Sequence, residues 1–518
     1  MTPATLALIA HVGPPDCATK RFPVNSGIGQ SSFAPRAPPL LPIRGLREIP
    51  PSNPNCGSRC LPGLPLSKRN LAVFDISAGV PYPRARVNIL RHTDADYAAR
   101  RRELAARSSL WNESIDRKTQ GILEAVRIQG DAALSEFAER FDGLRLQPDQ
   151  FRVTATELDL AASRVDTALR QAIRTAHRNI VRFSRKSLRR GWMTRNAQGG
   201  RVGEKYDPYR RVGIYVPGGT APLASTALMT VTLAQVAGCP EVVVCTPCGK
   251  DGAVNPGLLY AAQVAGATEV YRIGGAQAIG AMAYGTPAIA KVDKIFGPGN
   301  AYVVAAKRKV FGAVAIDLLP GPSEVLVLAD DSAPPAYIAA DLLAQAEHGS
   351  GHERVWLVTP SAALIEAVQR EVERQLPGLS RRTHAAAALE SNGWLILAPD
   401  LDAGIDWANE LAPEHCEVMT RHATRVAGKI ATAGAICIGP CTPNVLGDYV
   451  AGPSHVLPTG GAGRSFSGLT VDQFQRRTSL IQFDRAALRR SGPAVQKFAE
   501  IEGLDGHGRS AAIRWRDS

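Results

Sequence analysis

Several features that assign a chain to a special class are scarce or missing in this sequence of 518 residues. No apolar run approaches the ~20 residues that a membrane-spanning helix needs, which excludes an integral membrane protein. The nine cysteines are an odd number spread thinly over the chain, so a disulfide framework is excluded and a reducing compartment is expected. Aromatic residues make up only 6%, but 45% hydrophobic residues exclude disorder throughout. The length predicts a soluble protein of two or more globular units.

The excess of basic residues is concentrated at the N-terminus. Residues 1–84 carry nine Lys or Arg against three acidic residues, which accounts for +6 of the formal +13, and they hold 15 of the 37 prolines. We therefore expect residues 1–86 to be a disordered leader, either translated upstream of a misplaced start or a targeting segment. A cytoplasmic location is favoured, with a plastid as the alternative if the leader is real. The rest of the chain has no basic run interleaved with aromatics, so nucleic acid is not an expected partner.

Beyond the leader, helical spacing comes first and an alternation of strands and helices follows. From about Ser114 to Gly143 apolar residues recur every three to four positions, which predicts helices. Strands are predicted at Val212–Val216, Glu241–Cys245, Glu269–Ile273, Lys294–Phe296, Glu324–Ala329, Val355–Thr359, Trp394–Ala398 and Ala435–Ile438. Helices are predicted at Leu223–Val236, Gly257–Ala265, Ala276–Tyr284, Ala301–Val310 and Ser361–Gln375. This alternation indicates two α/β units with parallel sheets. The residues from Val471 on are expected to be mainly helical.

Three glycine-rich loops follow predicted strands, at Val216–Gly219, Ile273–Gln277 and Phe296–Asn300. Loops in this position bind ligands in open α/β sheets, because glycine lets backbone N–H groups approach a phosphate. None of the three is a GxGxxG motif, and ordinary turns remain the alternative. The CxxC motif Cys245–Cys248 leads into a loop and has no second CxxC at zinc-ribbon distance, so a redox or metal role is not favoured there.

Two short motifs carry side chains suited to chemistry. Gln345 and His348 lie three apart in the predicted helix Tyr337–His348, so both emerge on one face and can share an ion. A histidine that merely interacts with the helix dipole is the alternative. Glu414 and His415 place a carboxylate beside an imidazole, which suits proton transfer near neutral pH; a polar surface loop is the alternative.

Further candidate residues are scattered over the last part of the chain. Their distances in sequence do not indicate whether they meet in space, so spacing alone cannot assemble a site. They are Asp448, His455, Glu502 and His507.

Taken together, these strings resemble the histidinol dehydrogenase family along nearly the whole chain from about Val87 to the C-terminus. The resemblance rests on nine runs in family order, and no catalytic position departs from the pattern. The runs are Val212–Thr220 (VGIYVPGGT), Gly274–Gly280 (GGAQAIG), Lys291–Ala301 (KVDKIFGPGNA), Leu319–Leu328 (LPGPSEVLVL), Asp341–Ser350 (DLLAQAEHGS), Pro413–His415 (PEH), Gly447–Gly460 (GDYVAGPSHVLPTG), Leu469–Arg476 (LTVDQFQR) and Glu502–Arg509 (EGLDGHGR). Residues 1–86 match no part of the family.

The resemblance implies a particular α/β architecture. Two incomplete Rossmann-like domains with parallel sheets are expected, one inserted in the other, with small N- and C-terminal helical segments exchanged in a homodimer. The expected segments are 87–112 for the N-terminal helical segment, 113–214 with 323–469 for the first domain, 215–322 for the second domain, and 470–518 for the helical tail.

The resemblance also implies an activity: zinc-dependent oxidation of L-histidinol through L-histidinaldehyde to L-histidine with two NAD⁺, the last step of L-histidine biosynthesis. The implied catalytic residues are His415, a general base, and Glu414, which would activate the water that hydrates the aldehyde. The implied ligands of one Zn²⁺ per subunit are Gln345, His348, Asp448 and His507, the last reaching into the partner's site. These four, with Ser323, His415 and Glu502, are the implied substrate contacts. The implied NAD contacts are Tyr215, Gln277 and Asn300.

Three other functions remain open. A dehydrogenase of the same family acting on a different amino alcohol keeps the zinc and cofactor sites. A zinc hydrolase would use Glu414 and water without nicotinamide. A non-catalytic binding protein would act through the basic leader instead. No membrane is expected as a partner in any of these.

Overall fold

The computed structural model describes residues 87–106, 112–218 and 223–516. The expected leader 1–86 lies outside this range, as do residues 107–111 of the predicted N-terminal segment and Gly219 of the first glycine loop. Among the described residues, no helix is long and apolar enough to cross a membrane. The strands form three sheets, of six, five and three strands, and the two larger sheets are entirely parallel. The predicted α/β class is therefore confirmed.

The five-stranded sheet has the order β6-β5-β4-β7-β8. Its strands are β4 Arg211–Tyr215, β5 Glu241–Cys245, β6 Glu269–Tyr271, β7 Lys294–Phe296 and β8 Ala315–Ile316, and its connecting helices are α6 Ala224–Ala237, α7 Pro256–Ala265, α8 Gly275–Tyr284 and α9 Ala301–Val310. The predicted strands and helices of this region are confirmed to within two residues. The chain builds outward from β4 to β6 and then returns to add β7, which creates a switch point between β4 and β7. At such a point the carboxyl edge of a parallel sheet binds ligands.

The six-stranded sheet repeats this plan in the order β1-β11-β10-β9-β12-β13. Its strands are β1 Asn88–Arg91, β9 Glu324–Ala329, β10 Arg354–Thr359, β11 Gly393–Leu397, β12 His415–Met419 and β13 Ala435–Ile438. Its helices are α1 Tyr97–Ala106, α10 Pro335–Ala346, α11 Ala362–Gln375, α12 Arg382–Asn392, α13 Leu401–Leu411, α14 Ala423–Ala427 and α15 Asn444–Tyr449. The five-stranded sheet lies in sequence between β1 and β9, so one α/β unit is inserted in the other.

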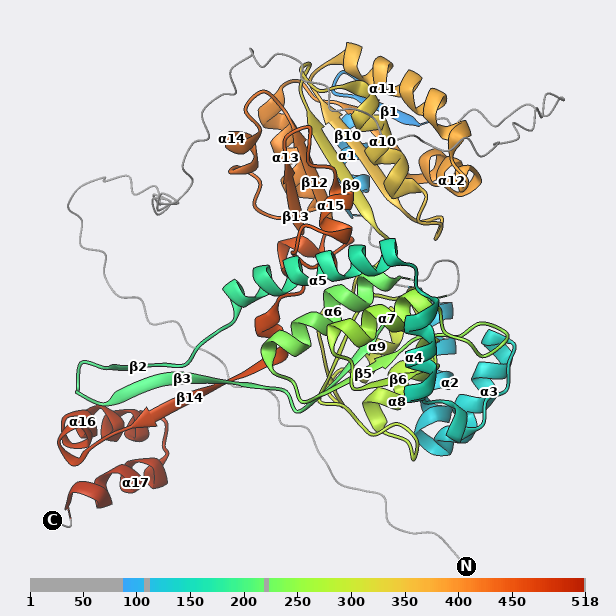
Figure 1. Cartoon of the computed structure of the whole chain (residues 1–518). Helices are drawn as coiled ribbons and strands as arrows, with labels where there is room; N and C mark the ends of the chain where they lie inside the picture. Colours follow the sequence, from blue (N-terminus) through green and yellow to red (C-terminus); the bar gives the residue numbers. More distant parts are fainter. Residues whose placement is uncertain (1–86, 107–111, 219–222, 517–518) are drawn as a thin grey trace, which may run out of the picture. The chain divides into compact units, whose positions relative to one another are not determined.

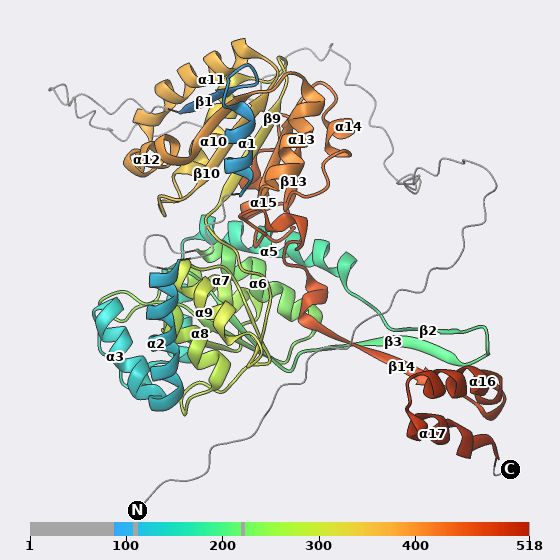
Figure 2. The ribbon, with the colours of Figure 1, turned by 180° about the vertical axis from the view of Figure 1, so that it is seen from behind.

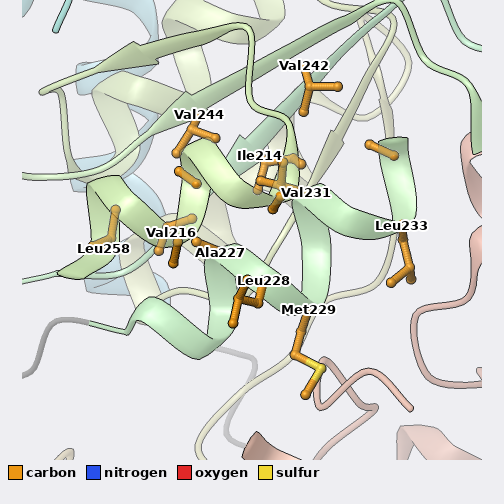
Figure 3. Packing of buried hydrophobic residues seen from close by; sticks show 14 of the residues in the cluster. Ile214, Val216, Ala227, Leu228, Met229, Val231, Leu233, Val242, Val244 and Leu258 are labelled. Atoms are coloured by element: carbon orange, nitrogen blue, oxygen red, sulfur yellow. The ribbon is translucent and has the colours of Figure 1, made fainter. Parts of the chain in front are cut away.

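Both faces of the five-stranded sheet are covered by helices. Ile214 and Val244 pack with Leu228 and Val231 of α6 on one face (Figure 3), whereas Val243 packs on the other face with α8 and α9. Because successive strand residues point to opposite faces, a strand buried on both sides reads as a continuous apolar run. This is why short β-branched runs in the sequence predicted these strands.

The six-stranded sheet is covered in the same way. Val325 and Val327 of β9 pack with α10, α11 and α12, while Leu326 and Leu328 pack with α13 on the opposite face. Trp407 of α13 is fully buried and is among the largest side chains packed on this opposite face.

The helices before β4 correct one predicted boundary. They are α2 Glu113–Gln129, α3 Asp131–Asp142, α4 Ala155–Arg164 and α5 Thr167–Ser187. The prediction assigned residues 113–214 to the first domain, but these helices pack on the five-stranded sheet. Leu123 and Leu134 share a core with Val243, and Ile173 shares one with Val244. Their apolar faces predicted helices, but a helical pattern does not show which sheet it covers.

A third, antiparallel sheet was not predicted. Its order is β14-β3-β2, formed by β2 Trp192–Arg195, β3 Arg201–Pro208 and β14 Gln475–Gln482. Figures 1 and 2 both show β14 running beside β3. The tail from Val471 is mainly helical, as expected, with α16 Arg485–Ile501 and α17 Asp505–Arg516, but the strand β14 precedes these helices and was not predicted. Polar residues dominate β14, so no apolar periodicity marks it.

The N-terminal segment 87–112 also differs from the expected helical segment. It begins with the strand β1, which pairs in parallel with β11 and completes the edge of the six-stranded sheet. Only α1 fulfils the helical expectation here. Short 3₁₀ helices lie at Pro148–Gln150, Leu376–Gly378, Ala462–Arg464 and Val471–Phe474.

Candidate active site

Glu414 and His415 lie at the amino end of the central strand β12, not in a surface loop. Both side chains are almost fully buried. The strand β12 pairs with β9 on one side and β13 on the other, so the two residues lie beside the point where the order of strand addition in the six-stranded sheet reverses. The surface-loop alternative is therefore wrong. The motif gave no strand signal in the sequence because Pro413 precedes it.

His415 faces two carboxyl groups in this buried setting. Its Nε2 atom lies 3.5 Å from Oδ1 of Asp448 and 4.0 Å from Oε1 of Glu414. Burial lowers the pKa of His415 to about 3, because a charged imidazole loses its hydration there. Burial likewise raises the pKa of Asp448 to about 7. His415 is therefore a neutral imidazole at neutral pH.

Glu414 is held in place by the start of β9. Its Oε2 atom accepts a hydrogen bond of 2.9 Å from the backbone N–H of Glu324, and the hydroxyl of Ser323 also bonds its carboxyl group. Burial outweighs these bonds and raises the pKa of Glu414 well above its usual value. Ser323, Glu414 and His415, all predicted from the resemblance, are thus brought together at the amino edge of the six-stranded sheet.

Gln345 and His348 come to the same region from α10. The helix ends at Ala346, so His348 lies two residues beyond it, and the predicted helix Tyr337–His348 is too long. The Nδ1 atom of His348 lies 3.1 Å from the backbone oxygen of Gln345. The buried amide of Gln345 accepts a 3.0 Å hydrogen bond from Nδ2 of Asn444 on α15, the helix that also carries Asp448.

His455 joins this cluster, although its sequence position did not indicate it. Its Nδ1 atom lies 3.0 Å from the backbone oxygen of Asp448, and its Nε2 atom lies 3.1 Å from Oγ1 of Thr226 on α6. Burial lowers the pKa of His455 to about 4. Repulsion from His455 and His348 contributes to the lowered pKa of His415, so the three imidazoles lie in one neighbourhood.

Three buried residues behind this cluster were not identified from the sequence: Asp341, Glu417 and Asn444. Glu417 accepts a 2.6 Å hydrogen bond from the backbone N–H of Asn444 and shares a hydrogen bond with Asp341 of α10. Burial, reinforced by Asp341, raises the pKa of Glu417 to about 9. Burial also raises the pKa of Asp341 to about 6. The only available sequence signal was that Glu417 alternates with His415, so both side chains point to one face of β12.

Glu502 and His507 are not brought to this cluster within the one chain described. Both are exposed, at the end of α16 and on α17 respectively. In the described part of the chain, no three His, Cys, Asp or Glu residues form a group that could hold a metal.

Three residues of this region carry donors that suit a zinc ion, with a fourth ligand still to be supplied. Asp448 supplies a carboxylate and His348 an imidazole, and the buried Nε2 atom of Gln345 has no hydrogen-bond partner among the described residues. Rotating the amides of both Gln345 and Asn444 by half a turn would keep a hydrogen bond between them, now from Nε2 of Gln345 to the otherwise unpartnered Oδ1 of Asn444, and would present the oxygen of Gln345 instead. Oxygen and imidazole donors are ordinary zinc ligands.

The described residues of the three glycine loops meet at the carboxyl edge of the five-stranded sheet. Gly297 has a φ of +105°, and a Cβ there would collide with the backbone oxygen of Tyr215. The hydroxyl of Tyr215 accepts a 3.1 Å hydrogen bond from the N–H of Gly275, which ties two of the loops together. The side chain of Asn300 caps α9 by accepting from the N–H groups of Tyr302 and Val303.

These loops also fit a dinucleotide. The Oε1 atom of Gln277 is buried and has no hydrogen-bond partner among the described residues, so it can accept one from a ligand. The absence of side chains at the glycines lets a ligand approach the backbone. Tyr215, Gln277 and Asn300 are therefore gathered at the switch point, although Asn300 already serves as a helix cap.

The chain is similar to known proteins over most of its length. The family model described as histidinol dehydrogenase matches residues 105–515. A histidinol dehydrogenase of Geobacillus kaustophilus is 48% identical over 393 residues, covering 76% of this chain and 92% of the relative, and one of Heliobacterium mobile is 46% identical, covering 79% and 95%. The crystal structure of histidinol dehydrogenase from Elizabethkingia anophelis superposes with a TM-score of 0.78 at 35% identity, covering 83% of this chain and 98% of that one.

Fold and site together define an α/β dehydrogenase, with glycine loops at the switch point of one parallel sheet and a buried imidazole–carboxyl cluster on the other. More particularly, the chain belongs to the histidinol dehydrogenase family. The predicted family is confirmed.

Proposed function

We propose that this chain oxidises L-histidinol through L-histidinaldehyde to L-histidine with two NAD⁺ in turn, the last step of L-histidine biosynthesis. The observation that carries the proposal is the buried, neutral His415 between Glu414 and Asp448 in a member of this family. A base that receives a hydroxyl proton must be unprotonated at the working pH, and burial keeps His415 in that form.

In the first oxidation, His415 takes the proton of the substrate hydroxyl at its Nε2 atom. Hydride leaves the carbon that bears this hydroxyl, and the alcohol becomes an aldehyde. NAD⁺, when bound, supplies the hydride acceptor. The carboxyl group of Asp448, 3.5 Å from Nε2, then stabilises the imidazolium that His415 becomes.

In the second oxidation, Glu414 takes a proton from the water that adds to the aldehyde, so that the hydrate can lose a second hydride. Because burial raises its pKa, Glu414 must first give up its own proton. The N–H of Glu324 and the hydroxyl of Ser323 stabilise the ionised carboxylate and fix the oxygen that faces the water. Ser323 also contacts the substrate in this proposal.

Gln345, His348 and Asp448 would hold one Zn²⁺ per subunit, with His507 supplied by the partner subunit. Zinc, when bound, supplies a Lewis-acidic centre that orients the imidazole and amino nitrogens of the substrate. The same four residues, His415 and Glu502 would line the substrate site.

Tyr215, Gln277 and Asn300 would contact the NAD at the switch point of the five-stranded sheet. The unpartnered oxygen of Gln277 supports this assignment, because a buried acceptor without a donor is costly. Keeping the aldehyde enclosed between the two oxidations would prevent its escape.

A homodimer with shared active sites completes the proposal. In this reading the first α/β domain spans 323–469 with the N-terminal strand, and the tail 470–518 crosses to the partner. The tail supports this exchange because it exposes large apolar side chains, with Phe498 66%, Ile501 72% and Ile513 61% accessible. Apolar residues grouped in this way mark interaction surfaces.

The experiment that tests the proposal is NADH formation from L-histidinol by the purified chain, with the products counted. Two NADH per L-histidine are expected. Turnover of a different amino alcohol with none on L-histidinol would instead support the family-member alternative, and turnover without NAD would support a hydrolase.

A further inference from the structure

A fully buried ion pair lies directly beneath one of the glycine loops. Lys307 belongs to α9 and Asp317 follows β8, and the side chains of both are completely inaccessible to solvent. The Nζ atom of Lys307 donates to Oδ1 of Asp317. Neither residue belongs to the catalytic cluster or to the proposed NAD contacts.

Both members of the pair bind the same residue of the loop. Nζ of Lys307 donates a 2.8 Å hydrogen bond to the backbone oxygen of Gly297. The backbone N–H of Gly297 donates a 2.8 Å hydrogen bond to Oδ2 of Asp317. The ion pair therefore takes up both polar backbone groups of Gly297 and fixes the orientation of its peptide units.

Gly297 occupies a position where small movements matter. It is the first residue after β7, at the switch point beside β4, and its φ of +105° suits only glycine. A Cβ at this position would collide with the backbone oxygen of Tyr215, whose hydroxyl in turn accepts a hydrogen bond from the N–H of Gly275. Fixing Gly297 thus fixes the loop Gly297–Asn300 relative to the other loops at this edge.

Stability alone does not account for a pair of this kind. Burying two ions removes their hydration, and well-packed apolar residues of similar volume are often as stabilising or more so. What an apolar pair cannot do is bond the N–H and the oxygen of Gly297. A loop held in its bound shape before the ligand arrives loses less entropy on binding.

We propose that Lys307 and Asp317 are positioning residues that hold the loop Gly297–Asn300 in the shape that accepts NAD. The inference rests on the proposed function, because it takes this loop as part of the NAD site. It predicts that the pair supports dinucleotide affinity separately from its effect on folding.

The test is the double variant Lys307→Met/Asp317→Leu, compared with Lys307→Met alone, in the full-length chain. The single variant leaves Asp317 buried and unpaired, and its melting temperature falls. The double variant regains much of that loss, but its Kd for NADH, titrated by fluorescence, stays at least tenfold weaker than that of the wild type. The KM for NAD⁺ rises correspondingly while the KM for L-histidinol is unchanged.

A matched control lies at the opposite edge of the same sheet. Arg211 on β4 binds Glu269 on β6 through two hydrogen bonds of 2.8 and 2.7 Å, far along the strands from the glycine loops. The variant Arg211→Met/Glu269→Leu lowers the melting temperature but keeps the Kd for NADH within twofold.

The possible outcomes separate this inference from the proposed function. A double variant of Lys307 and Asp317 that binds NADH within twofold of the wild type overturns the inference alone. So does a control variant of Arg211 and Glu269 that loses affinity as strongly. If the wild-type chain binds no NADH and reduces no NAD⁺, the proposed function fails, and the inference fails with it.

Discussion

Replacing Glu417 with glutamine tests the electrostatics behind the active-site cluster. Glu417 is buried, and its pKa is raised to about 9 by burial and by Asp341. Glutamine keeps the shape and the oxygen that accepts the N–H of Asn444, but it cannot ionise. Glu417→Gln therefore changes the pH dependence of stability while leaving the position of α15 intact.

The direction in which stability changes with pH depends on whether the folded or the unfolded chain holds the proton of Glu417. Between pH 4.5, the usual value for glutamate, and pH 9, the folded chain holds the proton of Glu417 whereas the unfolded chain loses it. The wild type therefore loses stability as the pH rises through this window, by at most about 1.4 kcal/mol per pH unit for one proton. The variant does not incur this loss. From pH 5 to pH 8 the ceiling is about 4 kcal/mol, and at least about 1 kcal/mol is expected.

Thermal unfolding at a series of pH values measures this difference. At pH 5 the wild type and Glu417→Gln should melt at similar temperatures, and by pH 8 the variant should melt about 1 °C or more above the wild type. Parallel melting curves across this range would refute the reasoning, since Glu417 would then titrate alike in the folded and unfolded chains. Glu417→Leu is the control, because it also removes the acceptor for Asn444 and should lower stability at both pH values.

Three further predictions concern catalysis. His415→Asn removes the base for the first oxidation, and stopped-flow detection of NADH should show a loss of about 10²- to 10⁴-fold; a rate within threefold of wild type would exclude this role. Glu414→Gln should spare aldehyde formation more than histidine formation when both products are quantified, and equal losses would contradict the division between the two residues. Deleting residues 1–86 should leave kcat and KM for L-histidinol unchanged, and loss of turnover would show that the leader takes part.

Much of the fold could be predicted because its strands are buried on both faces. In Glu241–Cys245 and Glu324–Ala329 every residue after the glutamate is apolar, and turn residues bound both runs, so their ends agree with the structure. The strand β14 could not be found in this way. Most of its residues are at least partly exposed, and it is defined by its hydrogen bonds with β3, about 270 residues earlier.

The helices α2 to α5 illustrate another limit. Their apolar spacing predicts helices, but the sheet they cover depends on contacts such as that between Ile173 and the core around Val244. Propensity and periodicity are local, whereas the choice of a packing partner is not.

The candidate site was only partly accessible to sequence reasoning. Glu414 and His415 were identified as a chemically suitable pair, yet their burial follows from the pairing of β12 between β9 and β13. His455 and Glu417 enter the cluster through folding alone, because nothing in their sequence neighbourhood relates them to His415. The grouping of Gln345 with Asp448 depends likewise on the hydrogen bond from Asn444.

We propose above that this chain is a zinc-dependent, NAD-linked dehydrogenase of L-histidinol. The most direct test is NADH production from L-histidinol by the wild-type chain, before and after treatment with a metal chelator. We expect two NADH per L-histidine formed, loss of turnover after chelation with the fold retained, and recovery on adding Zn²⁺. Full activity in a metal-free preparation, or no NADH from L-histidinol in the zinc-loaded chain, would contradict it.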